Sequence, residues 1–315
     1  MQVGFVHEGR VGWFPQSVAA YVTFAMVPWR SSWRLEIRDL MRATLSIGTT
    51  LTLLIATGCS HATQSPVMAV RASAFDASPG LSCFLLYELG VGELRRAPAE
   101  ACSMRITPAS TFKIPHALAA LDSGILAGPN VTLAYDEATD GPETWKRAHT
   151  LTTAMRYSVV WYFQRVAAML GPDRERQYLA KFDYGNRDAS SGLTTFWLDE
   201  SLRISPDEQE RFLARLYEDV LPVSKDAMQT VRQIWVQPQN VIVNAFGEHT
   251  FAVPWPAGSV VSAKTGSGDN VRWLVGHVER KPRGWVFVSC VIGTDLDPVA
   301  AIDLAAKSLR AEHVL

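Results

Sequence analysis

A serine and a lysine spaced one helical turn apart are the first residues in this sequence that could do chemistry. Ser110 and Lys113 stand within residues 106–115, and the run from 110 to 121 predicts a helix that ends before Gly124. Side chains three residues apart share one face of a helix, so the hydroxyl would lie beside the amine. An amine whose pKa is lowered by apolar surroundings can take the hydroxyl proton and make the serine nucleophilic. The simpler interpretation is an exposed lysine one turn after a helix start.

Three further short stretches could contribute polar groups to the same site. Ser158 is followed by Val159 and Val160 in a segment that we expect to be helical. Residues 184–186, Tyr-Gly-Asn, are expected in a loop, and residues 264–266, Lys-Thr-Gly, end an apolar strand. Each stretch also has a structural interpretation: a helix serine bonded to its own backbone, a turn, and the edge of a hairpin.

Composition and charge are those of a globular protein with a real core. The chain has 315 residues, of which 48% are hydrophobic, and its net charge is −1. This length suits one large or two small domains. The absence of a basic excess argues against a nucleic-acid partner.

The first 58 residues are expected to form a leader outside that core. Arg42, an apolar run over residues 51–55 and small residues before Cys59 predict a bacterial export signal, too short to span a membrane comfortably. Residues 56–59, Ala-Thr-Gly-Cys, resemble the cleavage box of lipoproteins, in which the cysteine is lipidated. Ordinary cleavage near Ala62 is the alternative, and the mass of the mature N-terminus would distinguish the two.

The residues before a second candidate start at Met41 form an upstream extension in this interpretation. The alternative is a first membrane span around residues 18–27, although that stretch is short for a bilayer. We expect an exported protein of the periplasm or cell envelope. If the leader is cleaved as in a lipoprotein, the protein would carry a lipid anchor at Cys59. Residues 59–70 would be a linker, and residues 71–315 one catalytic domain.

The order of the remaining patterns predicts the fold class. Strands are expected at residues 84–88, 93–96, 260–266, 271–278 and 285–292, and helices at 151–170, 173–182, 206–220, 224–235 and 297–311. The first helix would end at Gly171, residues 205–208 would form a capping box that opens the third, and Asp297 would cap the last. Strands at both chain ends with helices between them predict an α/β (α+β) fold. Its antiparallel sheet would be built from both ends and flanked by helices, with an all-helical lobe inserted.

Taken together and in this order, the four motifs resemble those of the class D serine β-lactamases, the oxacillinase group. Ser-x-x-Lys and Lys-Thr-Gly are shared with related serine enzymes, whereas Ser-x-Val in the middle and Tyr-Gly-Asn are typical of this class. Further matches occur at residues 196–198, 202–205 and 273–276. The resemblance covers most of residues 80–310. It implies a β-lactamase/transpeptidase-like fold, hydrolysis of β-lactam antibiotics and β-lactam resistance.

The resemblance assigns a role to each motif residue. It implies that Ser110 is the nucleophile and that Lys113, as N6-carboxylysine, is the general base. Ser158 would relay the proton to the leaving nitrogen, and Lys264 would place positive charge near the substrate carboxylate. The backbone N–H groups of Ser110 and Ser267 would form the oxyanion hole.

The remaining roles concern the substrate and the carbamate group of the carboxylated Lys113. Thr265 and Ser267, with Gly266 between them, would bind the substrate carboxylate. Trp197 would hold a carbamate oxygen through its indole N–H, and Val160 and Leu198 would screen the carbamate from water. No metal and no organic cofactor is implied, only carbon dioxide or bicarbonate for Lys113. The expected partners are small β-lactam substrates, and the oligomeric state is open. The substrate range is also open, because it depends on loops around Trp145, Leu198 and residues 267–272.

One departure from the family concerns carboxylate binding. Many members carry an arginine on the last helix, whereas residues 297–302 here contain none. Carboxylate binding then rests on Lys264, Thr265 and Ser267, with Arg272 as a further candidate.

Export also bears on the cysteines, because an exported chain matures in an oxidising compartment. Cys83 and Cys102 are expected in adjacent strands, which allows a disulfide; two buried thiols are the alternative. Cys290 is expected to be a buried free thiol.

Two other functions share the serine motif. One is a penicillin-binding transpeptidase or carboxypeptidase that acts on peptidoglycan, against which Val160 argues because those enzymes usually have asparagine there. The other is a β-lactam sensor domain that is acylated once without turnover. A sensor would also need several membrane spans, which the sequence patterns do not display.

Overall fold

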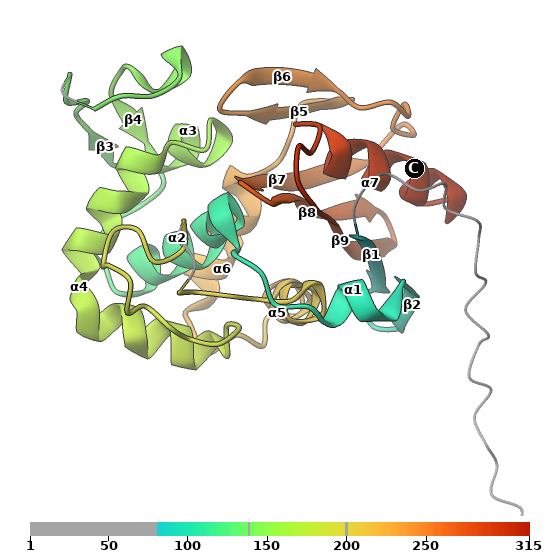
Figure 1. Ribbon diagram of the computed structural model, residues 1–315, viewed down its shortest axis with the longest axis horizontal. Helices are drawn as coiled ribbons and strands as arrows, with labels where there is room; N and C mark the ends of the chain where they lie inside the picture. Colours follow the sequence, from blue (N-terminus) through green and yellow to red (C-terminus); the bar gives the residue numbers. More distant parts are fainter. Residues whose placement is uncertain (1–80, 138, 199–200) are drawn as a thin grey trace, which may run out of the picture. The chain divides into compact units, whose positions relative to one another are not determined.

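The computed structural model describes residues 81–137, 139–198 and 201–315 (Figure 1). The predicted leader, the lipidation site at Cys59 and the linker lie outside these residues and stay predictions. Within the described ranges, no helix is both long and apolar enough to cross a bilayer.

A five-stranded antiparallel sheet forms the centre of the fold, with the strand order β2-β1-β9-β8-β7. Its strands come from both ends of the described chain: β1 (Leu81–Glu88), β2 (Gly92–Ala97), β7 (Val260–Gly268), β8 (Val271–Arg280) and β9 (Arg283–Ile292). The apolar runs of β1, β8 and β9 are long because both faces of the sheet are covered there. The predicted sheet from both chain ends is confirmed.

Alternating side chains of the sheet pack into two separate apolar cores. On β1, Phe84 and Leu86 pack with α7 (Ala300–Ala311), whereas Cys83 and Leu85 pack with the helices on the other face. This division follows from the two-residue period of a strand. Among those helices, α1 (Ala99–Ser103) and α5 (Pro206–Tyr217) contact β1 directly.

The inserted helices surround α2 (Lys113–Asp122), which contacts α4 (Val160–Phe182), α6 (Lys225–Ile234) and the short α3 (Leu151–Arg156). Every residue of α2 from Lys113 to Ala120 is buried. A helix enclosed on all sides needs an apolar composition. Lys113, the buried first residue of α2, is therefore an exception to this rule.

The structure corrects the predicted course of two helices. The serine lies in a 3₁₀ turn, η1 (Ala109–Phe112), which leads directly into α2. The predicted helix over residues 151–170 is broken between α3 and α4, because Ser158 adopts a left-handed conformation with φ 55°. The predicted break at Gly171 is present as a non-helical residue inside α4, with φ 75°.

At the starts of two other helices, side-chain hydrogen bonds determine where the helix begins. The capping box at α5 is confirmed, because Ser205 Oγ accepts from the N–H of Glu208, and Ser205 N–H donates to Glu208 Oε2 at 2.9 Å. The last helix was predicted to start at Asp297 but begins at Ala300, because the Asp297 carboxylate instead accepts from Val299 N–H at 2.9 Å in the preceding turn.

Cys83 and Cys102 are joined by a disulfide, and Cys290 is a buried free cysteine. The expectation that both bonded cysteines lie in strands was wrong for Cys102, which is on α1. The bond thus ties α1 to the strand that it covers.

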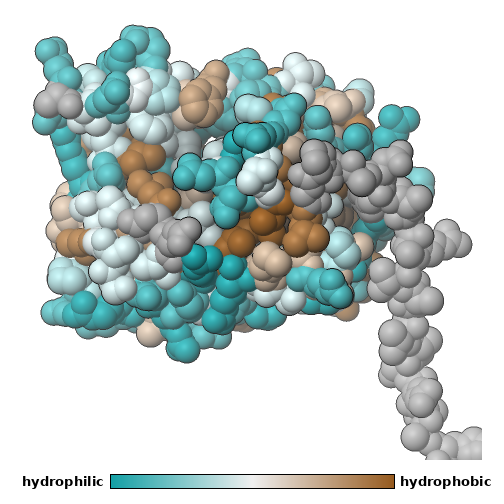
Figure 2. Space-filling view, in the orientation of Figure 1, coloured by the Kyte–Doolittle hydropathy of each residue, from teal (hydrophilic) through white to brown (hydrophobic). Residues whose placement is uncertain are grey.

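Two small strand pairs were not predicted. One joins β3 (Thr132–Leu133) to β4 (His149–Thr150), and the other is the hairpin of β5 (Val241–Asn244) and β6 (Gly247–Thr250). In Figure 1 this hairpin stands beyond β7, on the side of α3. In the same orientation, polar side chains cover much of the surface and apolar ones gather near its middle (Figure 2).

Candidate active site

The serine and the lysine of the first motif are in contact. Lys113 Nζ lies 2.7 Å from Ser110 Oγ, within hydrogen-bond distance. The turn that presents Ser110 is closed by the carbonyl of Pro108, which accepts from the backbone N–H of Thr111 at 3.1 Å and from its hydroxyl at 2.7 Å. The one-turn spacing therefore brings hydroxyl and amine together even though the local helix is 3₁₀.

A second serine–lysine pair lies beside the first. Lys264 Nζ donates to Ser158 Oγ at 2.8 Å and to the carbonyl of Thr265 at 2.9 Å. Ser158 occupies the left-handed residue between α3 and α4, and Lys264 lies on β7. The inserted lobe and the edge strand of the sheet thus meet at this contact.

Gly266 allows β7 to approach the serine turn closely. A Cβ at this position would lie 3.0 Å from the Pro108 carbonyl oxygen and 3.0 Å from the Thr111 methyl carbon. Both distances are shorter than ordinary van der Waals contacts. The glycine of Lys-Thr-Gly therefore relieves close packing here, next to any part that it plays in substrate binding.

Six of the predicted site residues line one cavity of about 270 Å³, and five further residues complete its wall. The predicted ones are Ser110, Ser158, Val160, Leu198, Thr265 and Ser267. The residues that complete the wall are Pro142, Trp145, Asn244, Ala245 and Phe246. Of these, only Trp145 was anticipated, because the other four depend on a loop and a hairpin that the sequence did not predict. A larger hollow of about 870 Å³ lies between α6 and the β8–β9 turn and contains none of the motif residues.

Both lysines are buried, and burial lowers their pKa values. Lys113 is fully inaccessible, and desolvation, together with the nearby charge of Lys264, brings its pKa well below the usual lysine value. Desolvation likewise lowers the pKa of Lys264 to about 7. No carboxylate of the described residues pairs with either amine, so each can lose its proton near neutral pH.

Aromatic rings pack around the start of α2, and the indole N–H of one of them has no acceptor. Lys113 Nζ lies 5.6 Å from the centre of the Phe163 ring, and Phe112 stacks on Trp197 with ring centres 6.0 Å apart. Trp197 is fully buried, and its indole N–H has no hydrogen-bond acceptor among the described residues. A buried donor without a partner is uncommon and destabilising. This N–H is therefore open to an acceptor that the described residues do not supply.

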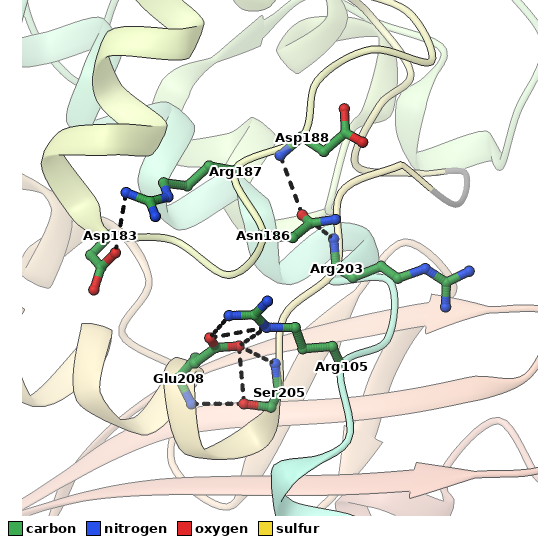
Figure 3. Close-up of polar contacts among 8 residues, drawn as sticks. All are labelled: Arg105, Asp183, Asn186, Arg187, Asp188, Arg203, Ser205 and Glu208. Atoms are coloured by element: carbon green, nitrogen blue, oxygen red, sulfur yellow. Dashed lines mark hydrogen bonds and ion pairs between the residues drawn. The ribbon is translucent and has the colours of Figure 1, made fainter. Parts of the chain in front are cut away.

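The Tyr-Gly-Asn stretch supports the site without entering it. Asn186 Oδ1 accepts from the backbone N–H of Arg203 at 2.9 Å (Figure 3). The side-chain amide of Asn186 donates to the Ser201 carbonyl at 2.7 Å. Gly185 has φ 53°, and a Cβ there would overlap the Arg203 carbonyl. These contacts hold the base of the loop that carries Trp197 and Leu198.

Arg272 is not among the residues that line the cavity. Its guanidinium donates to the backbone carbonyls of Gly268, Val271 and Leu296. Lys264, by contrast, donates to Ser158, which lines the cavity. The described residues also contain no cluster of three histidine, cysteine, aspartate or glutamate side chains placed to bind a metal.

Comparison with known proteins supports the relationship that the motifs indicated. Residues 89–307 match the model of the penicillin-binding protein transpeptidase domain. The β-lactamase OXA-1 of Escherichia coli is 31% identical over 270 residues, which cover 80% of this chain and 91% of OXA-1. OXA-48 of Klebsiella pneumoniae is 38% identical over 184 residues, covering 57% of this chain and 63% of OXA-48.

Solved structures agree with this result. The class D β-lactamase BAT-2 superposes with a TM-score of 0.66 at 30% identity, covering 75% of this chain and 93% of BAT-2. The class D β-lactamase OXA-427 gives a TM-score of 0.62 at 32% identity, covering 74% of this chain and 99% of OXA-427. Motif order, fold and relatives therefore lead to one assignment, and the chain belongs to the class D serine β-lactamases.

Proposed function

We propose that this protein hydrolyses β-lactam antibiotics through an acyl-enzyme on Ser110. The observation that carries the proposal is the 2.7 Å contact between Ser110 Oγ and the buried, readily deprotonated amine of Lys113. In the first step, Ser110 Oγ bonds to the lactam carbonyl carbon while the base at Lys113 takes its proton. The carbon–nitrogen bond of the ring then breaks, and Ser158, which accepts from Lys264 Nζ at 2.8 Å, would relay the proton held by the base at Lys113 to the leaving nitrogen.

The edge of β7 supplies the electrostatic part of the mechanism. Backbone N–H groups of Ser110 and Ser267 would bind the developing oxyanion. Thr265 and Ser267 line the cavity with Ser110, and Lys264 lies directly behind them. We assign the substrate carboxylate to these three residues, since Arg272 is engaged with backbone carbonyls.

Deacylation needs a base that can activate water, and an N-carboxylated Lys113 meets this need. A neutral amine can add carbon dioxide with loss of a proton, and burial favours the neutral form of Lys113. The resulting anion needs hydrogen bonds in place of water. The unpartnered indole N–H of Trp197 and the hydroxyl of Ser110 would hold it, which accounts for the unsatisfied donor.

The carbamate hypothesis predicts that Trp197→Phe makes turnover depend more steeply on bicarbonate. Phenylalanine keeps the aromatic packing but removes the N–H, and a hydrogen bond to a charged group contributes about 1.5–3 kcal/mol. We expect the bicarbonate concentration for half-maximal turnover to rise about 10-fold or more. The measurement is steady-state turnover in degassed buffer with bicarbonate added stepwise.

Trp285→Phe serves as the matched control, because Trp285 is equally buried but packs in the core that contains α7. This variant should follow the wild type at every bicarbonate concentration. An unchanged bicarbonate dependence in Trp197→Phe would show that the indole does not hold a carbamate.

Turnover itself distinguishes a β-lactamase from the two rival functions. Purified protein is mixed with a large excess of a chromogenic cephalosporin, and the released chromophore is counted per mole of protein. A β-lactamase gives many turnovers at a steady rate. A single stoichiometric burst would instead support a penicillin-binding transpeptidase or a sensor, and no release would contradict acylation altogether.

A further inference from the structure

A histidine and a glutamate form a buried pair that the proposed reaction does not use. His116 Nε2 lies 2.9 Å from Glu175 Oε1, and the two side chains are only 1% and 2% exposed. The pair joins α2 to the part of α4 that follows the break at Gly171. Replacing such a buried pair with apolar side chains of similar volume is often neutral or stabilising, so fold stability alone gives little reason for it.

The imidazole of this pair packs against the indole of Trp197. The two ring centres are 4.6 Å apart, and the rings are nearly perpendicular, at 86°. Trp197 has two further ring neighbours among the described residues, Phe196 with ring centres 5.1 Å apart and Phe112 at 6.0 Å. The His116 contact is the shortest of the three, and His116 is the one of these rings that is also hydrogen-bonded.

The rotation of the Trp197 indole is not fixed by a hydrogen bond of its own within the described residues. Its N–H has no acceptor there, and Thr107 Oγ1 donates to the Trp197 carbonyl at 3.0 Å, which restrains the backbone. A hydrogen bond weakens steeply as its angle departs from linear. The direction of the indole N–H therefore depends on the rings that pack around it.

The pair is also connected to Lys113. His116 follows Lys113 by three residues, so both start from one face of α2. Phe163 contacts the two of them: its ring centre lies 5.6 Å from Lys113 Nζ and 6.2 Å from the His116 ring centre, with 13° between the ring planes. The His116 ring thus contacts the groups that surround the amine as well as the indole that would bind its carboxyl group.

We propose that His116 is a positioning residue that aims the Trp197 N–H at the carbamate of Lys113, and that Glu175 fixes the His116 ring in this orientation. This inference rests on the proposed carbamate mechanism. Neither His116 nor Glu175 is among the residues that line the cavity, so neither is assigned a contact with substrate or a proton transfer.

The test replaces the pair by an apolar one, in the double variant His116→Leu/Glu175→Leu. Leucine is close in size to both residues, and both polar partners are removed together, so the fold should be retained. Carboxylation is measured without substrate, from the carbamate carbon signal in NMR spectra as ¹³C-labelled bicarbonate is added. The bicarbonate concentration for half-maximal carboxylation should rise about 5-fold, because a misaligned hydrogen bond is weakened but not lost.

Two single variants separate the ring from its hydrogen bond. His116→Gln keeps a donor for Glu175 but removes the ring, and it should show the same rise as the double variant. Glu175→Gln keeps an acceptor for the imidazole, and its half-maximal concentration should stay within about 2-fold of the wild type. Turnover of a penicillin should follow bicarbonate with the same shifts, whereas KM for the penicillin at saturating bicarbonate should not change.

Ser289→Ala is the matched control for the loss of a buried polar contact. Ser289 is fully buried, and its hydroxyl donates to the Ala301 carbonyl at 2.8 Å, between β9 and α7. This variant should unfold at a lower temperature without any change in bicarbonate dependence.

Wild-type bicarbonate dependence in both the double variant and His116→Gln would overturn the inference and leave the pair a structural role. Absence of a carbamate signal in the wild type would overturn it together with the carbamate mechanism. A wild type that forms the carbamate but hydrolyses no penicillin would contradict the proposed hydrolysis, and carboxylation of the variants would still decide the role of His116.

Discussion

Lys113→Met is expected to trap the acyl-enzyme and to lower turnover by about 10³-fold. Methionine matches the length and apolar character of the buried lysine stem but cannot accept a proton or carry a carboxyl group. General-base catalysis contributes about 10²–10⁴-fold per step, and Lys113 is the base for both acylation and deacylation in the proposed mechanism. Mass spectrometry should show slow formation of a covalent adduct that persists for hours, whereas the wild-type adduct should disappear within seconds.

The same substitution should stabilise the fold in buffer free of carbon dioxide. The unfolded lysine binds a proton below its ordinary pKa of 10.5, whereas burial keeps the folded amine neutral down to a much lower pH. The unfolded state therefore binds more protons in this window, so wild-type stability decreases as pH falls through it. The gain in unfolding free energy for Lys113→Met should be large at pH 7 and small near pH 10.

Urea unfolding at the two pH values is the measurement, and Lys225→Met is the matched control. Lys225 is exposed at the start of α6, so its replacement should change stability little at either pH. A Lys113→Met protein that is less stable than the wild type at pH 7 without carbon dioxide would contradict the view that an uncompensated amine is buried there.

Ser110→Ala should abolish both turnover and covalent labelling. Removal of the nucleophile in another serine hydrolase lowers kcat by roughly 10⁶-fold. Among the described residues, Ser110 is the one hydroxyl hydrogen-bonded to Lys113 Nζ. A mass spectrum after incubation with penicillin should show only the unmodified chain. Expression of the wild type in a susceptible bacterium should raise the inhibitory concentration of a penicillin, and the variant should not.

Ser123→Ala is the control for this comparison, because Ser123 stands at the other end of α2, where its hydroxyl donates to the Ala119 carbonyl at 2.6 Å. It should keep turnover and labelling near the wild-type level. Labelling of Ser110→Ala at another residue would assign the nucleophile elsewhere.

Local patterns in the sequence determined the parts of the fold that depend on neighbouring residues. Ser110 and Lys113 meet because one helical turn separates them, whether that turn is 3₁₀ or α. The apolar runs of β7, β8 and β9 predicted the antiparallel ladder, and the Ser205 capping box predicted the start of α5. The order of the motifs was enough to indicate the family, because each motif is a short local signal.

Tertiary structure alone decided how the remaining groups meet and what surrounds them. Ser158 and Lys264 are 106 residues apart, and their contact requires a left-handed break that the apolar pattern around Ser158 hid. Burial of Lys113 and the unsatisfied indole of Trp197 are properties of a closed core, which no single segment contains. The position of Phe246 likewise depends on a hairpin whose tip is hydrogen-bonded by Thr144, 101 residues away from Ala245 in the sequence, because such contacts arise only once distant segments pack.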